Sequence, residues 1–334
     1  MILFLISIAF RNLNPMDCRL PHSIERHEGA YTIRNRDERS QGLKTADPSD
    51  ISSRMDGPLA KLAGLLGGLE ETRGKVSVLT GAGISAESGI PTFRGPEGYW
   101  TVGSKEYRPE QMSTRAMFSL DPWEVWSWYL YRRTLCRKAV PNPGHSGVAR
   151  IEEILGDRFR LITQNVDGLH LRAGNTKERT FQIHGNLHFR RCATACSADL
   201  FPIPSSIGDR GRNQTLSPKE KASLKCPGCG GLTRPHVLWF DEYYDEHFYQ
   251  ANSAIRWAVE SALLLVVGTT GATTLPMQIG AIVSQNQDAI LIDVNPSPNP
   301  FQELARSHPN GLVLPGPSGE ILPKVVELWE KAGK

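Results

Sequence analysis

The sequence predicts an α/β fold built on a doubly wound parallel sheet, and three segments carry that prediction. Residues 263–267 and 289–294 are apolar runs, the second interrupted only by Asp293, and such runs are typical of parallel strands that helices cover on both faces. Residues 76–80 are predicted to form a short strand that leads directly into a glycine-rich turn. Because such strands alternate with helical patterns over ~200 residues, the pattern favours a doubly wound sheet.

The remaining elements follow from hydrophobic periodicity and from breaks in it. A helix is expected to begin near Pro58, since the leucines that follow fall on one of its faces. Residues 1–55 are predicted to be a disordered N-terminal segment, because the polar stretch from residue 11 onward has no apolar periodicity. Further helices are expected at 108–120, 123–138 and 146–155, further strands at 159–163 and 180–184, and a loop at 91–108.

Composition limits the class of protein. With 334 residues, 40% of them hydrophobic, the chain can form two domains or one large domain with an inserted module. The formal net charge is only +3 and the basic residues are scattered. Neither nucleic acid nor a membrane is therefore required as a partner.

The first ten residues, MILFLISIAF, leave the compartment open. They are apolar but too short to span a bilayer, which takes ~20 residues, and they lack the basic start of a secretory signal. Arginines between residues 11 and 36 favour a mitochondrial presequence, whereas acidic residues between 25 and 38 count against one. An unreliable start codon is the other interpretation. The protein is expected inside the cell, in mitochondria or else in the cytoplasm or nucleus.

The turn after the first strand reads GAGISA over residues 81–86 and fits the pattern G-x-G-x-x-A. Glycines there allow a tight turn and a close approach to a pyrophosphate. Small residues also serve ordinary strand–helix turns, so the pattern alone is weak. Pro91 cuts the helix short, and no acidic strand end lies ~20 residues on. The turn therefore indicates a nucleotide site unlike that of a standard dehydrogenase.

Four of the six cysteines form two close pairs, Cys192 with Cys196 and Cys226 with Cys229. Their short spacings suit a tetrahedral zinc site. Four protein ligands leave no open coordination position, so such a zinc would be structural. The alternative is two reduced, buried cysteine pairs. A nucleic-acid-binding ribbon is another role for such a module, and its weakly basic loop disfavours that role.

Two further stretches place polar side chains at the ends of predicted strands. Residues 163–170 read TQNVDGLH, at the edge of the sheet where ligands bind, although Asn, Asp and Gly are also common turn formers. Residues 181–185 read FQIHG, and a histidine at a strand end can serve as a general base near neutral pH. A lone histidine is more often structural, so the local sequence leaves both motifs open.

Together these motifs resemble the sirtuin family, in sequence and in order. The run GAGISAESGIPTFRG at 81–95 is followed by TQNVDGLH, by HG and by the two cysteine pairs, and the resemblance covers about residues 57–330. It implies an NAD-dependent protein-lysine deacylase whose products are free lysine, nicotinamide and O-acyl-ADP-ribose. The implied catalytic domain, 56–330, has Rossmann-like parts at about 56–95, 145–189 and 234–330, a helical module at about 96–144 and a zinc module at about 190–233.

The resemblance also implies roles for single residues. The implied NAD-binding residues are Gly81, Ala82, Gly83, Phe93, Arg94, Gln164, Asn165, Asp167, Gly268, Thr269, Asn295 and Ser318. Among them, Asp167 would hold the nicotinamide carboxamide and Asn165 the neighbouring ribose. His184 would be the general base, with Asn165 as the second catalytic residue. Phe240 and Glu242, on a loop beside the substrate, would bind the acylated peptide. The four paired cysteines would hold one structural zinc ion.

Tyr129 and Arg132 resemble the Tyr-x-x-Arg motif of the sirtuin branch that removes succinyl, malonyl and glutaryl groups. Positions three apart share a helix face, where a tyrosine hydroxyl and a guanidinium can grip an acyl carboxylate. In the alternative, Tyr129 packs in an aromatic-rich helix and Arg132 faces water, which leaves an ordinary deacetylase. The acidic-acyl interpretation is the favoured hypothesis.

Two departures from the family pattern motivate a further alternative. Asp241 stands where the family usually has glycine, and the 268–276 loop is one residue longer than usual and lacks its usual valine. A non-catalytic NAD-binding scaffold would explain both, although a decayed site should lose His184 and Asn165 first. An NAD-dependent ADP-ribosyltransferase using the same site is a second alternative. The expected partners are acylated lysines of protein substrates, with no direct nucleic-acid or membrane partner, and the protein is predicted to be a monomer.

Overall fold

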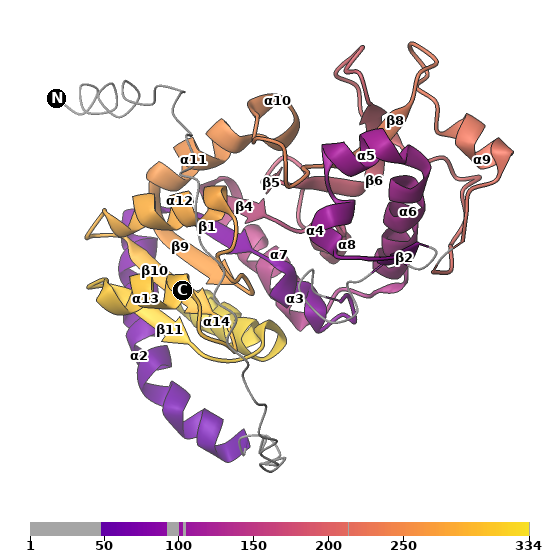
Figure 1. The fold of residues 1–334 in the computed structure, drawn as a ribbon. Helices are drawn as coiled ribbons and strands as arrows, with labels where there is room; N and C mark the ends of the chain where they lie inside the picture. Colours follow the sequence, from indigo (N-terminus) through magenta and orange to yellow (C-terminus); the bar gives the residue numbers. More distant parts are fainter. Residues whose placement is uncertain (1–47, 92–99, 103–104, 213, 334) are drawn as a thin grey trace, which may run out of the picture. The chain divides into compact units, whose positions relative to one another are not determined.

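The computed structural model describes residues 48–91, 100–102, 105–212 and 214–333, with side chains from residue 57 onward except at 100–102 and 105–106. The chain divides into two units, Met1–Ala46 and Asp47–Lys334, and the fold below is that of the second unit alone. Figure 1 shows its elements in chain order. Among the described residues, none of the helices combines the length and apolar character that crossing a bilayer requires.

The unit is built on a six-stranded sheet of order β11-β10-β9-β1-β4-β5, in which every neighbouring pair is parallel. The strands are β1 (Lys75–Thr80), β4 (Phe159–Thr163), β5 (Thr180–Gln182), β9 (Ser261–Val267), β10 (Ile290–Val294) and β11 (Gly311–Leu314). The chain runs outward from β1 through β4 to β5 and then from β9 through β10 to β11 on the other side, so the order reverses between β1 and β9 and the sheet is doubly wound. The predicted fold class is therefore confirmed, and β1, β4, β9 and β10 lie at the positions that the sequence predicted for strands, within two residues at each end.

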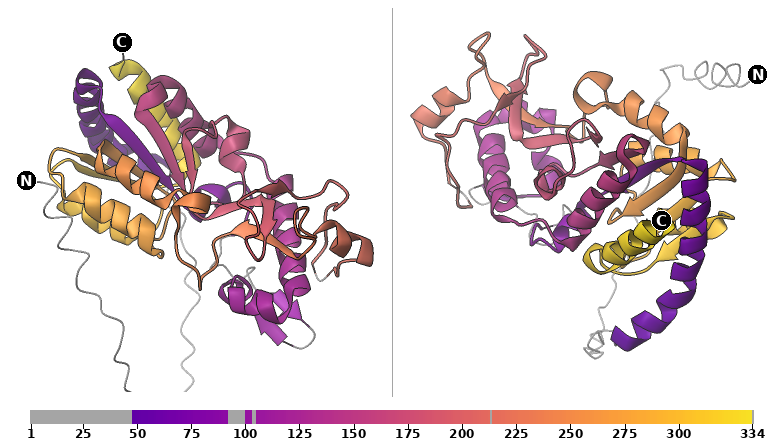
Figure 2. Two further views of the ribbon diagram at one scale, coloured as in Figure 1. Left: turned by 90° about the horizontal axis from the view of Figure 1, so that it is seen from above. Right: turned by 180° about the vertical axis from the view of Figure 1, so that it is seen from behind.

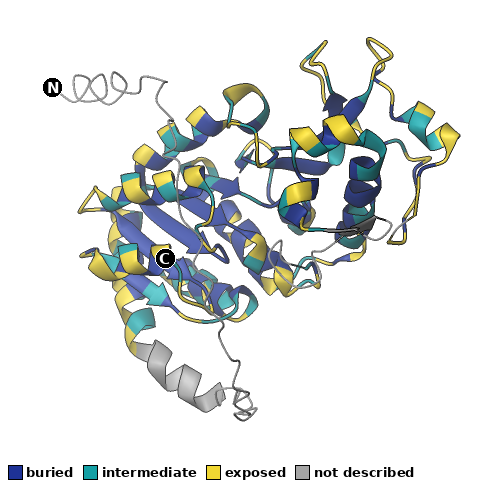
Figure 3. Cartoon of the chain, in the orientation of Figure 1, coloured by how far each residue is buried: buried dark blue, intermediate teal, exposed yellow. Residues whose placement is uncertain are grey.

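Helices cover both faces of this sheet, so most residues of its strands are buried (Figures 2 and 3). The alternating side chains of β9 show the two faces. Leu263, Leu265 and Val267 pack with α2, α7 and α14, whereas Leu264 and Val266 pack with α11, α12 and α13. The helices of this part are α2 (Pro48–Thr72), α3 (Ala82–Ala86), α7 (Pro143–Leu155), α8 (Leu169–Ala173), α10 (Glu246–Tyr249), α11 (Ala251–Val259), α12 (Thr274–Ser284), α13 (Pro300–Ser307) and α14 (Ser318–Ala332), with a 3-10 turn η2 (Gly156–Arg158).

A second hydrophobic core joins a helical module to a small antiparallel sheet. The helical module contains β2 (Trp100–Val102), β3 (Lys105–Tyr107), α4 (Pro109–Met112), α5 (Arg115–Leu120) and α6 (Pro122–Lys138). The small sheet has the order β7-β6-β8 and contains β6 (Gly185–Cys192), β7 (Phe201–Pro202) and β8 (Thr233–Val237), with α9 (Pro218–Ser223) in the insert. Trp126 of α6 links the two parts, because its Nε1–H donates to the carbonyl of Thr233, 2.8 Å away.

The structure corrects several predicted boundaries. Helix α2 starts at Pro48 and includes Pro58, so the predicted start near Pro58 is wrong and the expected boundary at 55/56 falls inside a helix. The single helix expected at 108–120 is two helices, because Ser113 leaves the helical conformation and Thr114 caps α5. The small sheet extends to Gly185 and Val237, beyond the expected 190–233. The expected loop at 91–108 contains the β2–β3 hairpin.

Candidate active site

One cavity of about 810 Å³ lies at the carboxyl edge of the parallel sheet. The ends of four strands contribute to its wall, through Ala82 after β1, Gln164 after β4, Gly268 after β9 and Asn295 after β10. Its volume lies within the ~300–1,000 Å³ typical of small-molecule sites. Parallel sheets of this type bind ligands at this edge.

The glycine-rich turn after β1 packs backbone to backbone against the turn after β9. A Cβ added to Gly83 would lie 2.7 Å from the carbonyl oxygen of Gly268, and one added to Gly81 would lie 2.7 Å from the Cβ of Thr269. Gly268 itself has φ +61°, a conformation that favours glycine. The two turns therefore need these glycines to approach each other. Gly81 serves this packing and does not line the cavity, whereas Ala82, Gly83 and Gly268 do.

The residues after β4 form a buried polar network with the glycine-rich turn. Asn165 donates from Nδ2 to the carbonyl of Gly81 and to Ser85 Oγ, both 3.0 Å away. Ser85 Oγ donates to Asp167 Oδ2 at 2.8 Å, and the backbone N–H of Leu169 donates to the other oxygen at 2.8 Å. Burial raises the pKa of Asp167 in spite of these bonds. The network fixes Asn165 and Asp167 in the cavity wall.

His184 lies beyond the end of β5, with its ring held between two partners. Its Nδ1 lies 3.0 Å from the backbone carbonyl of Gln164, which can only accept, so Nδ1 carries the proton. Nε2 is then the acceptor, and the hydroxyl of Tyr244 donates to it at 2.8 Å. Burial lowers the pKa of His184 to about 4. The side chain is therefore a neutral base at physiological pH, with its basic nitrogen directed to a residue of the cavity wall.

Helix α6 provides the opposite, helical part of the wall. Asp121 caps this helix by accepting from two backbone N–H groups, and Pro122 occupies the first position, where no N–H is needed. Tyr129, Arg132 and Cys136 line the cavity from this helix, on one face at spacings of three and four. Tyr129 and Arg132 thus lie in the wall of the same cavity as His184.

The Tyr129 hydroxyl is bonded on two sides. It lies 2.6 Å from Ser113 Oγ, and the indole N–H of Trp239 donates to it at 3.0 Å. Ser113 is buried and lines the cavity because the chain breaks between α4 and α5 at this residue. Burial raises the pKa of Tyr129, so the hydroxyl stays protonated.

The loop after β8 is anchored by its acidic residues. The carboxylate of Asp241 accepts from the backbone N–H groups of Arg115 and Ala116, at 2.7 and 3.1 Å, and so caps α5. Glu242 pairs with the buried Arg234, and although burial raises the pKa of Glu242, these hydrogen bonds bring it below its ordinary value. The departure at Asp241 is thus accounted for by a helix cap. Glu242 lines the cavity while its carboxylate serves the loop.

The lengthened loop after β9 also has a role. Gln164 donates from Nε2 to Thr269 Oγ1 at 2.9 Å, and Thr273 donates to Gln164 Oε1 at 3.1 Å. Both threonines line the cavity. The loop therefore holds the side chain of Gln164 at both ends of its amide.

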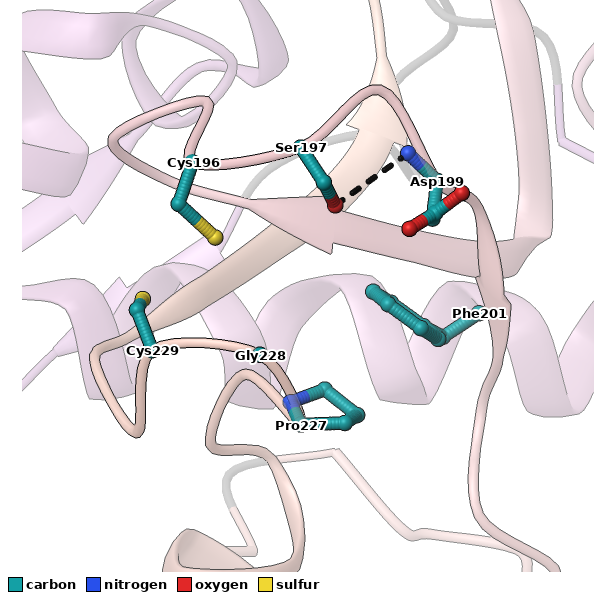
Figure 4. Close-up of a pocket in the computed structure, with 7 residues that line it drawn as sticks. All are labelled: Cys196, Ser197, Asp199, Phe201, Pro227, Gly228 and Cys229. Carbon is teal, nitrogen blue, oxygen red and sulfur yellow. Dashed lines mark hydrogen bonds between the residues drawn. The ribbon is translucent and has the colours of Figure 1, made fainter.

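The four paired cysteines gather beside a pocket of the small sheet, and Figure 4 shows the sulfurs of Cys196 and Cys229 facing each other. Their sulfur atoms all lie within 4.8 Å of one another. Two of the sulfur pairs are 3.6 and 3.7 Å apart, far beyond the ~2.05 Å of a disulfide. Two sulfurs bound to one zinc ion at ~2.3 Å in tetrahedral geometry lie ~3.8 Å apart. The cluster fits a tetrahedral metal ion.

Most of the predicted site residues meet at the cavity. Those that line it are Ala82, Gly83, Tyr129, Arg132, Gln164, Asn165, Asp167, His184, Phe240, Glu242, Gly268, Thr269, Asn295 and Ser318. Phe93 and Arg94 lie outside the described residues. Among the further residues that line the cavity are Ser113, Cys136, Thr273 and Tyr244, which were not predicted from the sequence. Of these four residues, only Thr273 had a signal in the local sequence, because it lies in the unusual 268–276 loop that lacks the family's valine.

Fold and site together define an α/β enzyme with a ligand cavity at the carboxyl edge of its sheet, a neutral histidine base and a separate four-cysteine module. The Sir2 family model matches residues 81–274. The chain belongs to this family, the sirtuins, and is an NAD-dependent enzyme.

Named relatives agree with this assignment. The chain is 39% identical to an NAD-dependent protein deacylase from Leptospira interrogans over 252 residues, which are 75% of this chain and 92% of the relative. A Sir2 homologue solved with NAD has a TM-score of 0.65 at 31% identity, covering 84% of this chain and 95% of that one. A mutant Sir2 homologue solved with 2′-O-acetyl ADP ribose has a TM-score of 0.66 at 32% identity, covering 84% and 98%.

Proposed function

We infer that this chain is an NAD-dependent protein-lysine deacylase, and we propose that its preferred acyl groups are the acidic ones: succinyl, malonyl and glutaryl. The observation that carries the acyl preference is the presence of Tyr129 and Arg132 in the same cavity wall as His184. The relatives named NAD-dependent protein deacylase and the complex with 2′-O-acetyl ADP ribose support the reaction itself.

The residues present suit NAD as the co-substrate. The cavity offers backbone groups from two glycine turns and amide and hydroxyl side chains from neighbouring strand ends. Amides and hydroxyls match ribose hydroxyls and a carboxamide, and closely approaching backbone suits a pyrophosphate. When bound, NAD would supply an electrophilic anomeric carbon.

His184 is suited to the proton transfer of this reaction. As a neutral base it would accept the proton that a ribose hydroxyl loses when that hydroxyl attacks the acyl carbon. Asn165 and Asp167, fixed by the Ser85 network, would hold the nicotinamide end of the co-substrate. Much of the rate comes from this positioning, because the acyl oxygen and the anomeric carbon must meet in line.

The physical case for an acidic acyl group rests on Arg132. Its side chain is only 9% exposed, and burial lowers the pKa of the guanidinium, yet arginine stays protonated in proteins. A buried cation at the cavity wall favours a carboxylate partner, which it can bind through two parallel hydrogen bonds. The hydroxyl of Tyr129, positioned by Ser113 and Trp239, adds a polar group one helical turn away. An acetyl group has no charge to use this arrangement.

The test is a paired turnover assay on one peptide sequence carrying succinyl-lysine or acetyl-lysine, followed by mass spectrometry. A charge-assisted hydrogen bond contributes ~1.5–3 kcal/mol, so kcat/KM is expected to favour the succinyl peptide by ~10–100-fold. Faster removal of the acetyl group would contradict the acidic-acyl preference and would leave Tyr129 and Arg132 with a packing role only. Transfer of ADP-ribose to protein side chains, without O-acyl-ADP-ribose, would establish the ADP-ribosyltransferase instead.

We also propose that the cysteine cluster holds one structural zinc ion. Metal analysis of the purified protein is expected to give about one zinc per chain, since four thiolates fill its coordination sphere. Replacing Cys226 by serine should abolish the bound zinc and lower the unfolding temperature. Cys136→Ala, which removes a cysteine outside the cluster, should keep the zinc. A metal-free protein of unchanged stability would contradict the proposal.

A further inference from the structure

The hydroxyl of Tyr244 is hydrogen-bonded to the basic nitrogen of His184. The Gln164 carbonyl fixes the proton on Nδ1, so the Nε2 lone pair is the only site at which the ring can accept a proton. The hydroxyl of Tyr244 donates to that lone pair over 2.8 Å, and both side chains line the cavity. The oxygen of Tyr244 therefore stands between the basic nitrogen of His184 and a ribose hydroxyl that has to give its proton to it.

The Tyr244 ring is held in place from both sides. Two residues before it, Glu242 is ion-paired with Arg234 and accepts from the backbone N–H of Trp239. One residue after it, Asp245 caps α10 by accepting from the N–H of Phe248 at 2.6 Å. The ring itself packs against the core on one face of the parallel sheet. Such fixed flanks do not suit a side chain that swings away for each substrate.

The Tyr244 hydroxyl can also serve both protonation states of His184. Burial raises the pKa of Tyr244 to about 12, so the phenol keeps its proton at physiological pH. Towards neutral His184 it donates, and towards the imidazolium it accepts from Nε2–H. One contact thus persists before and after proton transfer.

We propose that Tyr244 relays the proton from the ribose hydroxyl to His184. Oη of Tyr244 would accept the proton that the ribose O–H gives up, while that ribose oxygen bonds to the acyl carbon and the π pair of the bond between that carbon and the lysine nitrogen moves onto the nitrogen. At the same time the phenolic proton moves to Nε2, so that Tyr244 ends neutral and His184 ends as imidazolium. This inference rests on the proposed deacylase function, and it concerns the step after cleavage of the nicotinamide–ribose bond.

The relay is tested by Tyr244→Phe, which keeps the ring and removes the oxygen. Formation of free lysine is expected to fall by ~10²-fold, the lower end of general acid–base effects. Exchange of labelled nicotinamide into NAD, which needs only the preceding step, should stay within about twofold of the wild type. Tyr243→Phe is the matched control, because the neighbouring Tyr243 is 92% exposed, and it should leave both rates unchanged.

A second readout needs neither NAD nor peptide. In the ligand-free protein, the ¹⁵N resonance of His184 Nε2 reports its hydrogen bond and should shift in Tyr244→Phe but not in Tyr243→Phe. If Tyr244→Phe formed free lysine at the wild-type rate or faster, the relay would be refuted. The Tyr244 hydroxyl would then only block access to Nε2 of His184. An equal loss of exchange and turnover would assign Tyr244 a structural role. A wild type that removes no acyl group would refute the proposed function, whereas an unchanged Nε2 resonance would refute the contact alone.

Discussion

Replacing His184 by alanine is expected to lower the formation of free lysine by ~10²–10⁴-fold, because the ribose hydroxyl then has no base to accept its proton. Binding of NAD should persist, since the His184 ring is hydrogen-bonded to the Gln164 carbonyl and Tyr244, whereas Asn165 and Asp167 are held by the separate Ser85 network. Exchange of nicotinamide should also persist, because it precedes proton removal. Mass spectrometry of the peptide and calorimetry with NAD measure the two effects.

His247→Ala is the matched control, since His247 is an exposed histidine outside the cavity wall. It should keep wild-type turnover. A His184→Ala protein that turns over normally would refute the assignment of the base. If the unsubstituted protein bound NAD but did not turn over either peptide, the result would favour the non-catalytic NAD-binding scaffold.

The same assignment fixes the pH dependence of the wild type. A base must be neutral to act, and burial lowers the pKa of His184 from its usual 6.5 to about 4. Lowering the pKa extends the neutral form to lower pH, so kcat/KM should stay nearly constant from pH 7.5 down to ~5.5. A loss of half the activity near pH 6.5 would show an unperturbed histidine instead.

The sequence predicted the sheet and much of the cavity because both depend on local signals. The apolar runs that became β9 and β10 are buried on both faces, and burial of this kind is visible in composition alone. Gln164, Asn165 and Asp167 follow a strand directly, so their place at the ligand-binding edge could be expected from the fold class.

The residues that were missed reach the cavity through contacts between distant segments. Tyr244 meets His184 across 60 positions, and Asp241 caps a helix whose first residues lie 126 and 125 positions earlier. Ser113 enters the wall only because one expected helix breaks there into two. Such pairings depend on how loops cross between the two cores, and the hydrophobic periodicity of the sequence does not predict these crossings. Asp241, which departs from the family pattern in the loop after β8, caps α5 and so holds that loop against the helix.

Replacing Arg132 by methionine is expected to abolish the preference for acidic acyl groups. Removing one partner of a buried charge pair costs ~2–5 kcal/mol, so kcat/KM for the succinyl peptide should fall by ~30-fold or more. Turnover of the acetyl peptide should remain similar or rise, because the apolar methionine replaces a cation that an uncharged acyl group does not use. The ratio of the two kcat/KM values is the measured quantity, and it is insensitive to the fraction of active protein.

Arg137→Met is the matched control on the same helix. Arg137 lies in the last turn of α6, outside the cavity wall, in an ion pair with Asp209 in which both side chains are more than two-fifths exposed. An exposed pair of this kind contributes little, so the control should keep the succinyl preference. If Arg132→Met lowered both peptides equally, Arg132 would be a packing residue of α6. The acyl preference of the enzyme would then depend on the size of the cavity, and no longer on its charge.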